Sequence, residues 1–385
     1  MKYKLKEIFD LHMGKTPSRN NAEYWNSNEY KWISIADLSK TGKYIRDTKE
    51  HLSKQAIDES GIKLIPANTV IMSFKLSIGK TAITAEDMYS NEAIMAFHDK
   101  HVVDILPEYL FYMFKFKNWD EGSNKAVMGK TLNKATLSDV EIDVCSIEKQ
   151  REIVDILNKI MNILENRDNE IVLLDNLIKA RFVEMFGDVI HNSKKWQVCL
   201  FAEITSSRLG KMLDAKQQTG RNSYPYLANF NVQWFRFNLE NLNKMDFDEK
   251  DRAEFELREG DLLVCEGGEI GRCAVWHNEL QPCFFQKALH RVRCNHQIIL
   301  PDYLAWWFRY NCDYGGFSAL AGAKATIAHL PGAKLKQLQV AVPPMELQEQ
   351  FAVFVAQTDK SKVAVQKALD EAQLLFDSLM QEYFG

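Results

Sequence analysis

Residues 147–186 have the sequence IEKQREIVDILNKIMNILENRDNEIVLLDNLIKARFVEMF, and this stretch decides the fold. It contains neither proline nor glycine. Its apolar residues recur at spacings of three and four, which is the pattern of one face of a helix. Gly187 follows as a stop signal. Such a helix of 40 residues would extend about 60 Å, whereas an ordinary helix has only about 11 residues. The stretch therefore predicts a coiled coil or a spacer.

A second stretch, residues 345–384, repeats this pattern and is followed by Gly385. Glu148 and Gln150 correspond to Glu346 and Gln348, and ten apolar positions of the first stretch fall on apolar residues of the second. Two unrelated helices would share a hydrophobic period, but they would not also share the polar start and the glycine stop. The two helices are therefore predicted to be copies, and we expect them to pair antiparallel as a coiled coil.

The segments before the helices repeat as well. Residues 106–110, LPEYL, match residues 300–304, LPDYL, and Ile78-Gly79-Lys80 matches Ile270-Gly271-Arg272. The repeat of about 195 residues is too long for the unit of a solenoid, which spans about 20–50 residues. It indicates a duplicated module, a globular domain followed by a long helix, with internal pseudo-twofold symmetry.

Four segments follow from this duplication. We expect a first globular domain at 1–146, a central spacer helix at 147–187, a second globular domain at 188–344 and a C-terminal spacer helix at 345–385. Each domain is predicted to be α+β or mixed α/β. The strands expected are 31–35, 69–74, 80–85, 92–97, 224–229, 261–265, 272–276 and 287–293, with helices near 107–117 and 301–310.

Composition is typical of a globular protein. The chain has 385 residues, of which 46% are hydrophobic and 26% are charged, and its length favours two domains. It has no apolar run long enough to span a membrane, and its first residues, MKYKLKEIFD, lack the apolar core of a secretory signal. The seven cysteines include no C-x-x-C pair. These features predict a cytoplasmic protein with reduced thiols and no membrane partner.

Motifs for catalysis are nearly absent from the sequence. Three Gly-Lys-Thr triplets, at 14–16, 79–81 and 129–131, resemble the end of a phosphate-binding loop, but each lacks the glycine five positions earlier. Cys273, His277 and Cys283 have loosely metal-like spacing without a full ligand set. A Ser-His-Asp set stays open, because its members need not be neighbours in sequence. We therefore predict a chain with no catalytic or metal residues.

The domains do offer polar, basic loops. Residues 122–136, GSNKAVMGKTLNKAT, and the matching residues 315–329, GGFSALAGAKATIAH, contain no acid. Lysine and arginine release counterions from DNA, and Asn, Gln, Arg and Lys can contact base edges. In 228–236, ANFNVQWFR, Asn229, Asn231 and Gln233 alternate as on one exposed face of a strand. The other interpretation is that all of these are solvated loops and strand edges. The candidate DNA-binding residues are Lys15, Thr16, Lys75, Lys80, Lys125, Lys130, Thr131, Asn133, Lys211, Asn229, Asn231, Gln233, Arg272, Lys287, His290, Arg291, Lys324 and Thr326.

Several segments together are typical of one protein family. They are 14–18 (GKTPS), 24–26 (YWN), 32–38 (WISIADL), 209–214 (LGKMLD), 268–274 (GEIGRCA), 286–292 (QKALHRV), 342–348 (VPPMELQ) and 181–188 (RFVEMFGD). With the order domain, helix, domain, helix, the whole chain resembles the DNA-specificity subunit of type I restriction–modification systems. The first helix start, residues 145–150 (CSIEKQ), departs from the family's Pro-Pro-Leu-x-x-Gln signature because it lacks both prolines.

This resemblance implies a role for each segment. Each globular domain would be a target-recognition domain that binds one half of a bipartite, asymmetric site in double-stranded DNA, and the paired helices would act as a ruler that sets the spacing. Two methylation subunits would dock on the helices, and motor-nuclease subunits would join the full complex. The chain itself would bind no cofactor, because S-adenosylmethionine, ATP and Mg would be held by the partner subunits.

Two alternatives belong to other classes. A coiled-coil scaffold with two protein-binding domains would bind its partners with little dependence on salt and would have no preference for a duplex sequence. A methyltransferase or nuclease in its own right would show activity from the purified chain, although the motifs for such an enzyme are missing.

The basic loops allow a first test. We expect Lys130→Ala and Lys324→Ala each to weaken DNA binding similarly on all sequences and to lower the salt slope by about one, because a glycine-flanked lysine suits a phosphate contact. The measurement is the affinity of the assembled complex for cognate and scrambled duplexes across a salt series. Unchanged affinity at every salt concentration for both variants would mean that these loops do not contact DNA.

Overall fold

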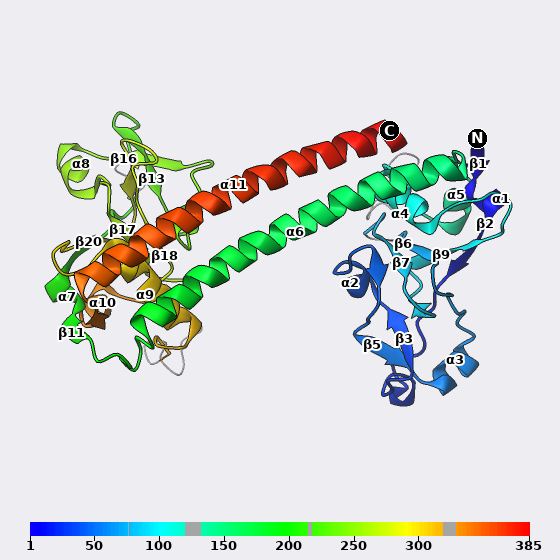
Figure 1. The fold of residues 1–385 in the computed structure, drawn as a ribbon, viewed down its shortest axis with the longest axis horizontal. Helices are drawn as coiled ribbons and strands as arrows, with labels where there is room; N and C mark the ends of the chain where they lie inside the picture. Colours follow the sequence, from blue (N-terminus) through cyan, green and yellow to red (C-terminus); the bar gives the residue numbers. More distant parts are fainter. Residues whose placement is uncertain (76, 120–131, 215–217, 319–328) are drawn as a thin grey trace. The chain divides into compact units, whose positions relative to one another are not determined.

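The computed structural model describes residues 1–75, 77–119, 132–214, 218–318 and 329–385. The chain forms two compact units (Figure 1). Unit 1 comprises residues 1–168 and 366–385, and unit 2 comprises residues 169–365. The boundaries between the units fall within the two long helices rather than at their ends. No helix among the described residues combines the length and the apolar character that a membrane crossing needs.

The main sheet of unit 1 has the strand order β2-β9-β6-β7-β4. The first three neighbouring pairs are antiparallel, and β4 runs parallel to β7. Burial of the apolar residues on β6 and β9 explains why these segments are strands, because both are nearly continuous apolar runs. The strands are β2 (Phe9–Met13), β9 (Ile94–Asp99), β6 (Val70–Ser73), β7 (Thr81–Thr84) and β4 (Tyr44–Ile45).

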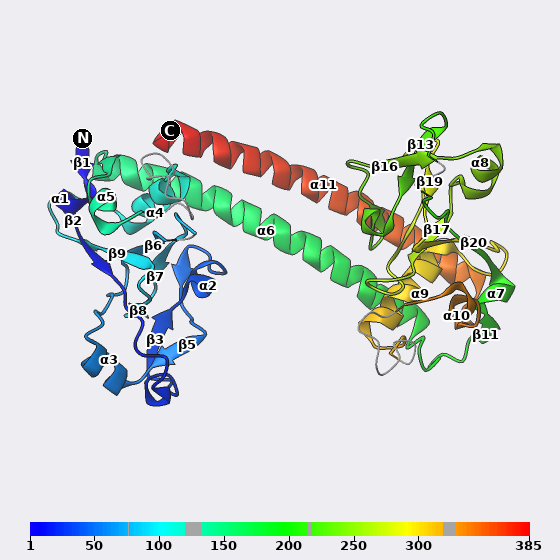
Figure 2. The same cartoon turned by 180° about the vertical axis from the view of Figure 1, so that it is seen from behind.

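Smaller elements surround this sheet. In a second sheet, β3 lies between β5 and β8 (Figure 2), antiparallel to β5 and parallel to β8. A two-stranded pair, β1 with β10, joins the start of the chain to the segment before the first long helix. The bounds are β3 (Tyr30–Ile33), β5 (Glu50–Leu52), β8 (Tyr89–Ser90), β1 (Lys2–Lys4), β10 (Glu141–Asp143), α1 (Leu5–Ile8), α2 (Ile35–Leu38), α3 (Lys54–Ser60), α4 (Pro107–Phe116), α5 (Lys134–Ser138) and the 3-10 helix η1 (Ala22–Tyr24).

Unit 2 has a main sheet of order β12-β20-β17-β18, antiparallel throughout. A second sheet places β13 between β16 and β19, antiparallel to the first and parallel to the second. The remaining strand pairs are β11 with β21 and β14 with β15. The bounds are β11 (Gln197–Leu200), β12 (Thr205–Leu209), β13 (Ser223–Leu227), β14 (Val232–Gln233), β15 (Arg236–Phe237), β16 (Asn243–Asp246), β17 (Leu262–Cys265), β18 (Cys273–Val275), β19 (Phe284–Phe285), β20 (Leu289–Cys294), β21 (Gln339–Val342), α7 (Phe201–Ile204), η3 (Asn229–Asn231), α8 (Glu249–Phe255), α9 (Pro301–Asp313) and α10 (Gly332–Lys336).

The two units share one strand pattern. The order β2-β9-β6-β7 in unit 1 corresponds to β12-β20-β17-β18 in unit 2, and β5-β3-β8 corresponds to β16-β13-β19, with the parallel pair in the same place. All eight strands and both short helices expected from the sequence are present, within a few residues of the predicted bounds. The prediction of a mixed α/β fold is therefore confirmed.

The two predicted long helices are also present, as α6 (Ile147–Phe186) and α11 (Met345–Phe384), of 40 residues each. In unit 1, Leu157 of α6 and Phe376 of α11 belong to one buried core that includes α4, where the rings of Tyr112 and Phe376 lie 6.3 Å apart. In unit 2, Phe182 of α6 lies 5.5 Å from Phe351 of α11 and 5.8 Å from Tyr303 of α9, measured between ring centroids. In each unit, therefore, parts of both long helices pack against the domain's own helix.

A buried glutamine fixes the start of each long helix. Gln150 is 0% exposed. Its amide oxygen accepts from the backbone N–H of Leu106 at 2.9 Å, and its nitrogen donates to the carbonyls of Asp104 and Cys145, each at 2.9 Å. Gln348 is also 0% exposed and makes the same contacts in unit 2, with Leu300 N–H at 2.8 Å and with the carbonyls of Ile298 and Pro343 at 3.0 and 2.8 Å. Leu106 and Leu300 are the N-cap residues of α4 and α9. The glutamine therefore joins the long helix to the short one.

Candidate nucleic-acid interface

The topology of unit 1 gathers several candidate residues at one end of the main sheet. Because neighbouring strands are antiparallel, β2 and β6 end at the same edge at which β7 and β9 begin. Lys15 and Thr16 follow β2, Lys75 follows β6 and Lys80 precedes β7. Backbone bonds hold these loops together, from Lys15 N–H to the Ser90 carbonyl at 2.8 Å and from Phe74 N–H to the Ala93 carbonyl at 3.0 Å. We call residues 14–18, 74–75, 77–80 and 90–93 the first strand-end face.

The polar groups of this face are only loosely paired. Lys15 is exposed and donates to the backbone carbonyl of Ser60. Lys80 donates to the Ser39 hydroxyl at 2.5 Å, and the ammonium of Lys75 lies 5.2 Å from the ring of Phe74. None of these three contacts is an ion pair, so the lysines can attract an anionic ligand.

One acid also belongs to the first strand-end face. The hydroxyl of Thr16 donates to the Glu92 carboxylate. This hydrogen bond is the main cause that lowers the pKa of Glu92, so the carboxylate is charged at neutral pH. Thr16 is therefore engaged within the protein, and a duplex at this face would meet one negative charge among the lysines.

Glycines on the face explain two of the three Gly-Lys-Thr triplets. A Cβ at Gly14 would collide with the backbone carbonyls of Ser90 and Asn91. Gly79 has φ +89°, and a Cβ there would lie 2.9 Å from the Trp119 ring. Close packing therefore accounts for the glycine in each of these two triplets.

The predicted acid-free loop of unit 1 returns to this face. Lys125, Lys130 and Thr131 lie outside the described residues, so their positions stay predictions. Leu132, which follows them, donates its N–H to the Phe74 carbonyl at 3.2 Å. Asn133 is exposed, and its side-chain oxygen caps α5 by accepting from Thr136 N–H at 2.8 Å. One end of the loop is therefore anchored on the first strand-end face.

Unit 2 has a corresponding edge. There β12 and β17 end where β18 and β20 begin, and Gly210 N–H donates to the Leu289 carbonyl at 3.0 Å. This edge carries Lys211, Arg272 and Lys287 from three different loops. We call residues 210–211, 266–272 and 286–288 the second strand-end face. Leu330 N–H donates to the Glu266 carbonyl at 2.6 Å, so one end of the second acid-free loop reaches this face, although Lys324 and Thr326 lie outside the described residues.

The cations of the second face are more tightly paired than those of the first. Lys211 forms an ion pair with Asp251 and donates to the Asp246 carbonyl at 2.7 Å, and its side chain is 20% exposed. Arg272 donates to the Asn229 carbonyl at 3.0 Å and lies 3.6 Å from the Glu269 carboxylate. Lys287 is exposed, and within the described part of the chain its ammonium has no ion-pair partner. Lys287 is thus the cation of this face most available to an anionic ligand.

The prediction that Asn229, Asn231 and Gln233 share one exposed face of a strand is wrong. Residues 229–231 form the 3-10 helix η3. Asn231 is 1% exposed; its side-chain oxygen accepts from Ala228 N–H at 2.9 Å, and its nitrogen donates to the Asn238 carbonyl at 3.0 Å. Asparagine side chains compete for backbone groups and so favour turns over strands. Asn229 and Gln233 likewise donate to backbone carbonyls, of Gly267 at 3.1 Å and of Phe230 at 2.9 Å.

His290 and Arg291 also serve the domain itself. His290 is 1% exposed, and its Nε2 lies 3.0 Å from the Leu330 carbonyl, to which it donates. Burial lowers the pKa of His290. Arg291 donates to the Glu254 carbonyl at 2.6 Å and lies over the Phe285 ring. Both residues are on β20 rather than in the strand-end loops. Because Asn231 and His290 are each 1% exposed, their side chains are not available to a duplex.

Phe230 lies between two of the candidate asparagines and was not itself predicted to bind DNA. The side chain of Phe230 is 57% exposed, on a turn beside the second strand-end face. The neighbouring asparagines were predicted to bind DNA because an amide can form hydrogen bonds with bases, whereas a phenyl ring cannot. The sequence signal was an aromatic residue between two asparagines.

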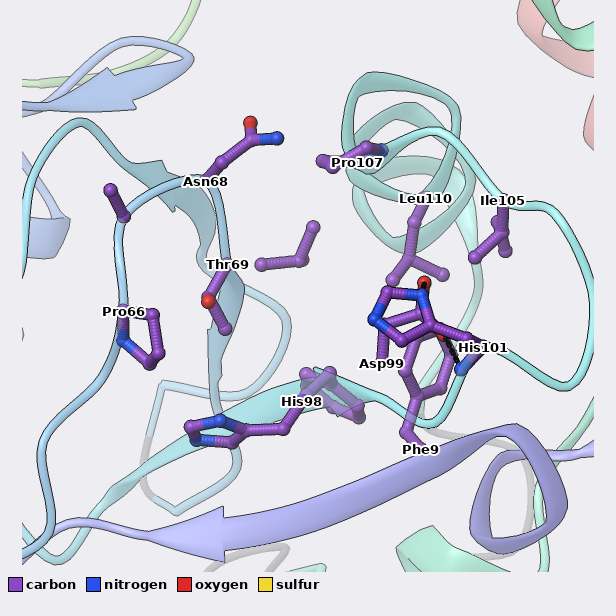
Figure 3. A pocket seen from close by; sticks show the side chains of 13 residues that line it. Phe9, Pro66, Asn68, Thr69, His98, Asp99, His101, Ile105, Pro107 and Leu110 are labelled. Atoms are coloured by element: carbon purple, nitrogen blue, oxygen red, sulfur yellow. Dashed lines mark hydrogen bonds and ion pairs between the residues drawn. The ribbon is translucent and has the colours of Figure 1, made fainter.

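A cavity of 420 Å³ in unit 1 is the alternative site (Figure 3). It lies between residues 66–70, the end of β9 and the start of α4, at the sheet end opposite the first strand-end face. Asp99 and His101 line it, with 3.3 Å between Asp99 Oδ2 and His101 Nδ1. Thr69 is the single hydroxyl among its lining residues, and no base is shown near that hydroxyl. Within the described residues, no cluster of three potential metal ligands occurs.

Comparison with known families gives two matches within the chain. The family model described as "Type I restriction modification DNA specificity domain" matches residues 1–173 and again residues 193–372. These ranges include the main sheet of each unit and a part of the long helix that follows it.

Curated relatives have the same description. The chain is 28% identical over 189 residues to the type I restriction enzyme MjaIX specificity subunit of Methanocaldococcus jannaschii, covering 48% of this chain and 43% of the relative. It is 26% identical over 197 residues to the EcoR124I/EcoR124II specificity subunit of Escherichia coli, covering 50% and 48%. The matched regions thus span about half of each relative.

Solved structures share the fold over the full length. The S subunit of a type I restriction–modification system from M. genitalium has a TM-score of 0.59 at 14% identity, with 100% of this chain and 96% of that chain covered. A chain from a study of complex assembly in the type I system has a TM-score of 0.60 at 15% identity, with 100% and 97% covered. At such identities the likeness concerns the fold alone.

The burial of His290 leads to a prediction about pH. The pKa of His290 in the folded state lies below the ordinary value of 6.5. As the pH falls, the unfolded state therefore binds more protons than the folded state. Stability should therefore decrease as the pH falls from about 7 to about 5, and His290→Gln should reduce this decrease. The measurement is the thermal midpoint against pH. The exposed His296→Gln is the control and should follow the unmodified chain. An identical pH dependence in the His290 variant would contradict the assignment.

Proposed function

The chain belongs to the family of type I restriction modification DNA specificity domains, and we propose that it is the subunit that selects the DNA sequence for a type I restriction–modification complex. The observation that carries the proposal is the presence of two strand-end faces, one in each unit, with cations at equivalent loop positions. Lys15 follows β2 and Lys211 follows the equivalent strand β12. Lys80 precedes β7 and Arg272 precedes the equivalent strand β18. Such cations would neutralise phosphates and set the register on a duplex.

The two units would bind different half-sites. Each unit in this proposal is a target-recognition domain, assigned to residues 1–146 and 188–344. A dimeric repressor must bind the same half-site twice, whereas fused copies are free to diverge. Here the second face holds two of its cations, Lys211 and Arg272, in ion pairs with Asp251 and Glu269. In the first face, Lys15 and Lys80 donate to neutral groups. The DNA site would therefore be bipartite and asymmetric.

The long helices would set the distance between the half-sites. We propose that α6 and α11 form one antiparallel coiled coil and that the duplicated modules are related by a pseudo-twofold axis. Support comes from each unit separately, since Leu157 and Phe376 share the core of unit 1 and Phe182 lies against Phe351 in unit 2. A helix rises by about 1.5 Å per residue, so a paired spacer has a fixed length.

Catalysis would belong to the partner subunits. In the proposed assembly two methylation subunits use S-adenosylmethionine, and motor-nuclease subunits use ATP and Mg. This chain would bind none of these cofactors and would act in the cytoplasm, where its seven free cysteines would remain reduced.

Exposed apolar residues on the helices provide a surface for the methylation subunits. In unit 2, Val172 and Leu173 of α6 are 57% and 66% exposed, and Val363 of α11 is 71% exposed. In unit 1, Leu374 of α11 is 70% exposed. Large apolar side chains on long polar helices are typical of protein interfaces, because a partner can remove them from water.

Variants of this surface test the partner proposal. Leu173→Glu combined with Val363→Glu should reduce copurification with the methylation subunits by more than about tenfold, because burying an unpaired carboxylate in an apolar interface is costly. Both residues are exposed, so the stability of the chain alone should change little. Val102→Glu is the control, because Val102 is 60% exposed and lies outside the long helices. Normal recovery of the methylation subunits with the double variant would contradict docking at this surface.

An exchange of domains tests the function directly. Replacing residues 1–140 by the equivalent domain of a relative should change one half of the methylated site and leave the other half and the spacer length unchanged, because each unit has its own strand-end face. The measurement is sequencing of methylated bases in a host that expresses the hybrid with its methylation subunits. An exchange that changes both halves would show that the units do not bind DNA independently. Salt-insensitive partner binding without any duplex preference would favour the scaffold alternative.

A further inference from the structure

A short turn after β13 displays Phe230 at the second strand-end face. The turn consists of residues 228–232, and the buried Asn231 fixes it through its bonds to Ala228 N–H and to the Asn238 carbonyl. Gln233 donates to the carbonyl of Phe230 itself at 2.9 Å. The backbone around Phe230 is therefore held by side chains on its C-terminal side, while its ring remains 57% exposed.

Unit 1 contains a corresponding segment with a different residue at its tip, although this segment is the short α-helix α2 rather than a 3-10 helix. The capping contact is shared, since Ser34 N–H donates to the Asp37 carboxylate at 2.9 Å as Ala228 N–H donates to the Asn231 side chain. Each turn is also tied to its strand-end face by one matching backbone bond, from Asn91 N–H to the Ile33 carbonyl and from Gln286 N–H to the Leu227 carbonyl, both at 3.1 Å. The residue equivalent to Phe230 is Ala36, which is exposed.

A cation of the face holds each turn in place. In unit 1, Lys80 donates to the hydroxyl of Ser39 at 2.5 Å, directly after α2. In unit 2, Arg272 donates to the Asn229 carbonyl at 3.0 Å, and Asn229 in turn donates to the Gly267 carbonyl at 3.1 Å. In both units, therefore, an equivalent cation contacts this segment, and the side chain at its tip differs between them.

We propose that Phe230 makes apolar contact with the base pairs of the half-site bound by unit 2, and that the tip of this turn is a specificity-determining position in both units. The inference rests on the proposed function. A phenyl ring cannot form the hydrogen bonds by which polar side chains distinguish bases, but it can contact a thymine methyl group or enter a base step as a wedge. A rigid backbone limits the entropy lost on binding, which favours a defined contact over a mobile one.

The experiment uses the chain assembled with its methylation subunits and a library of duplexes with randomised sequence. Sequencing of the bound DNA defines the preferred site for each variant. Phe230→Ala should relax the preference at one or two positions of a single half-site and lower affinity for the selected site by about five- to 150-fold, which is the range for loss of recognition at one base pair. Ala36→Phe should alter the other half-site alone. Val198→Ala, at an exposed position on β11, is the control and should change neither.

Two further measurements identify the kind of contact. If Phe230 contacts a thymine methyl, replacing one thymine of the selected site by uracil should reproduce the loss for the unmodified chain and add nothing for Phe230→Ala. If the ring enters a base step, the unmodified complex should unstack a 2-aminopurine placed there, and the alanine variant should not. Either result supports the proposal. Thermal unfolding of each variant verifies that the fold is retained, as expected for two exposed positions.

Several outcomes would overturn the inference. Phe230→Ala with the same selected site and affinity would show that the ring does not contact DNA, and an equal loss on unrelated duplexes would show a contact without specificity. These results differ from failure of the proposed function, in which the unmodified complex itself would select no sequence from the library.

Discussion

The attachment of each long helix to its domain depends on a buried glutamine at the start of the helix. Gln150 and Gln348 each accept one backbone hydrogen bond and donate two, in the same pattern, to the segments before α4 and α9 and to the residues just before the helix. A buried amide that lost these partners would cost about 1–3 kcal/mol for each unsatisfied group. Because a helix is stiff, fixing its first turn to the domain fixes the direction in which it leaves that domain.

The two ends of the main sheet in unit 1 carry different features. In unit 1, the loops with Lys15, Lys75 and Lys80 lie at one edge, whereas the cavity between residues 66–70 and α4 lies at the other. The short helix α4 and the start of α6 share a core with the sheet, so the strand-end loops are carried on a rigid base. A site that must keep register along a duplex benefits from this, because loops on a rigid scaffold hold their side chains in place.

Sequence patterns predicted regular structure better than the interface. The helices at 147–186 and 345–384 and the strands around them follow from hydrophobic period and burial, which are local properties. The roles of Asn231 and His290 depended on the tertiary structure, since one is buried in a turn and the other beneath Leu330. The approach of Lys15, Lys75 and Lys80 requires the strand order, which the residues alone did not give. Phe230, which we propose as a base contact, has no hydrogen-bonding side-chain group, so the residue types that indicate base recognition did not include it.

Hydrogen–deuterium exchange tests the central claim, that the strand-end faces bind DNA. The assembled complex would be measured with and without a duplex that contains the site it methylates. The account predicts slower exchange on DNA binding in residues 14–18, 77–80, 210–211, 266–272 and 286–288, with little change at residues 66–70 and 98–101 at the opposite sheet end of unit 1. Protection confined to that opposite end, or absent from both strand-end faces, would contradict it.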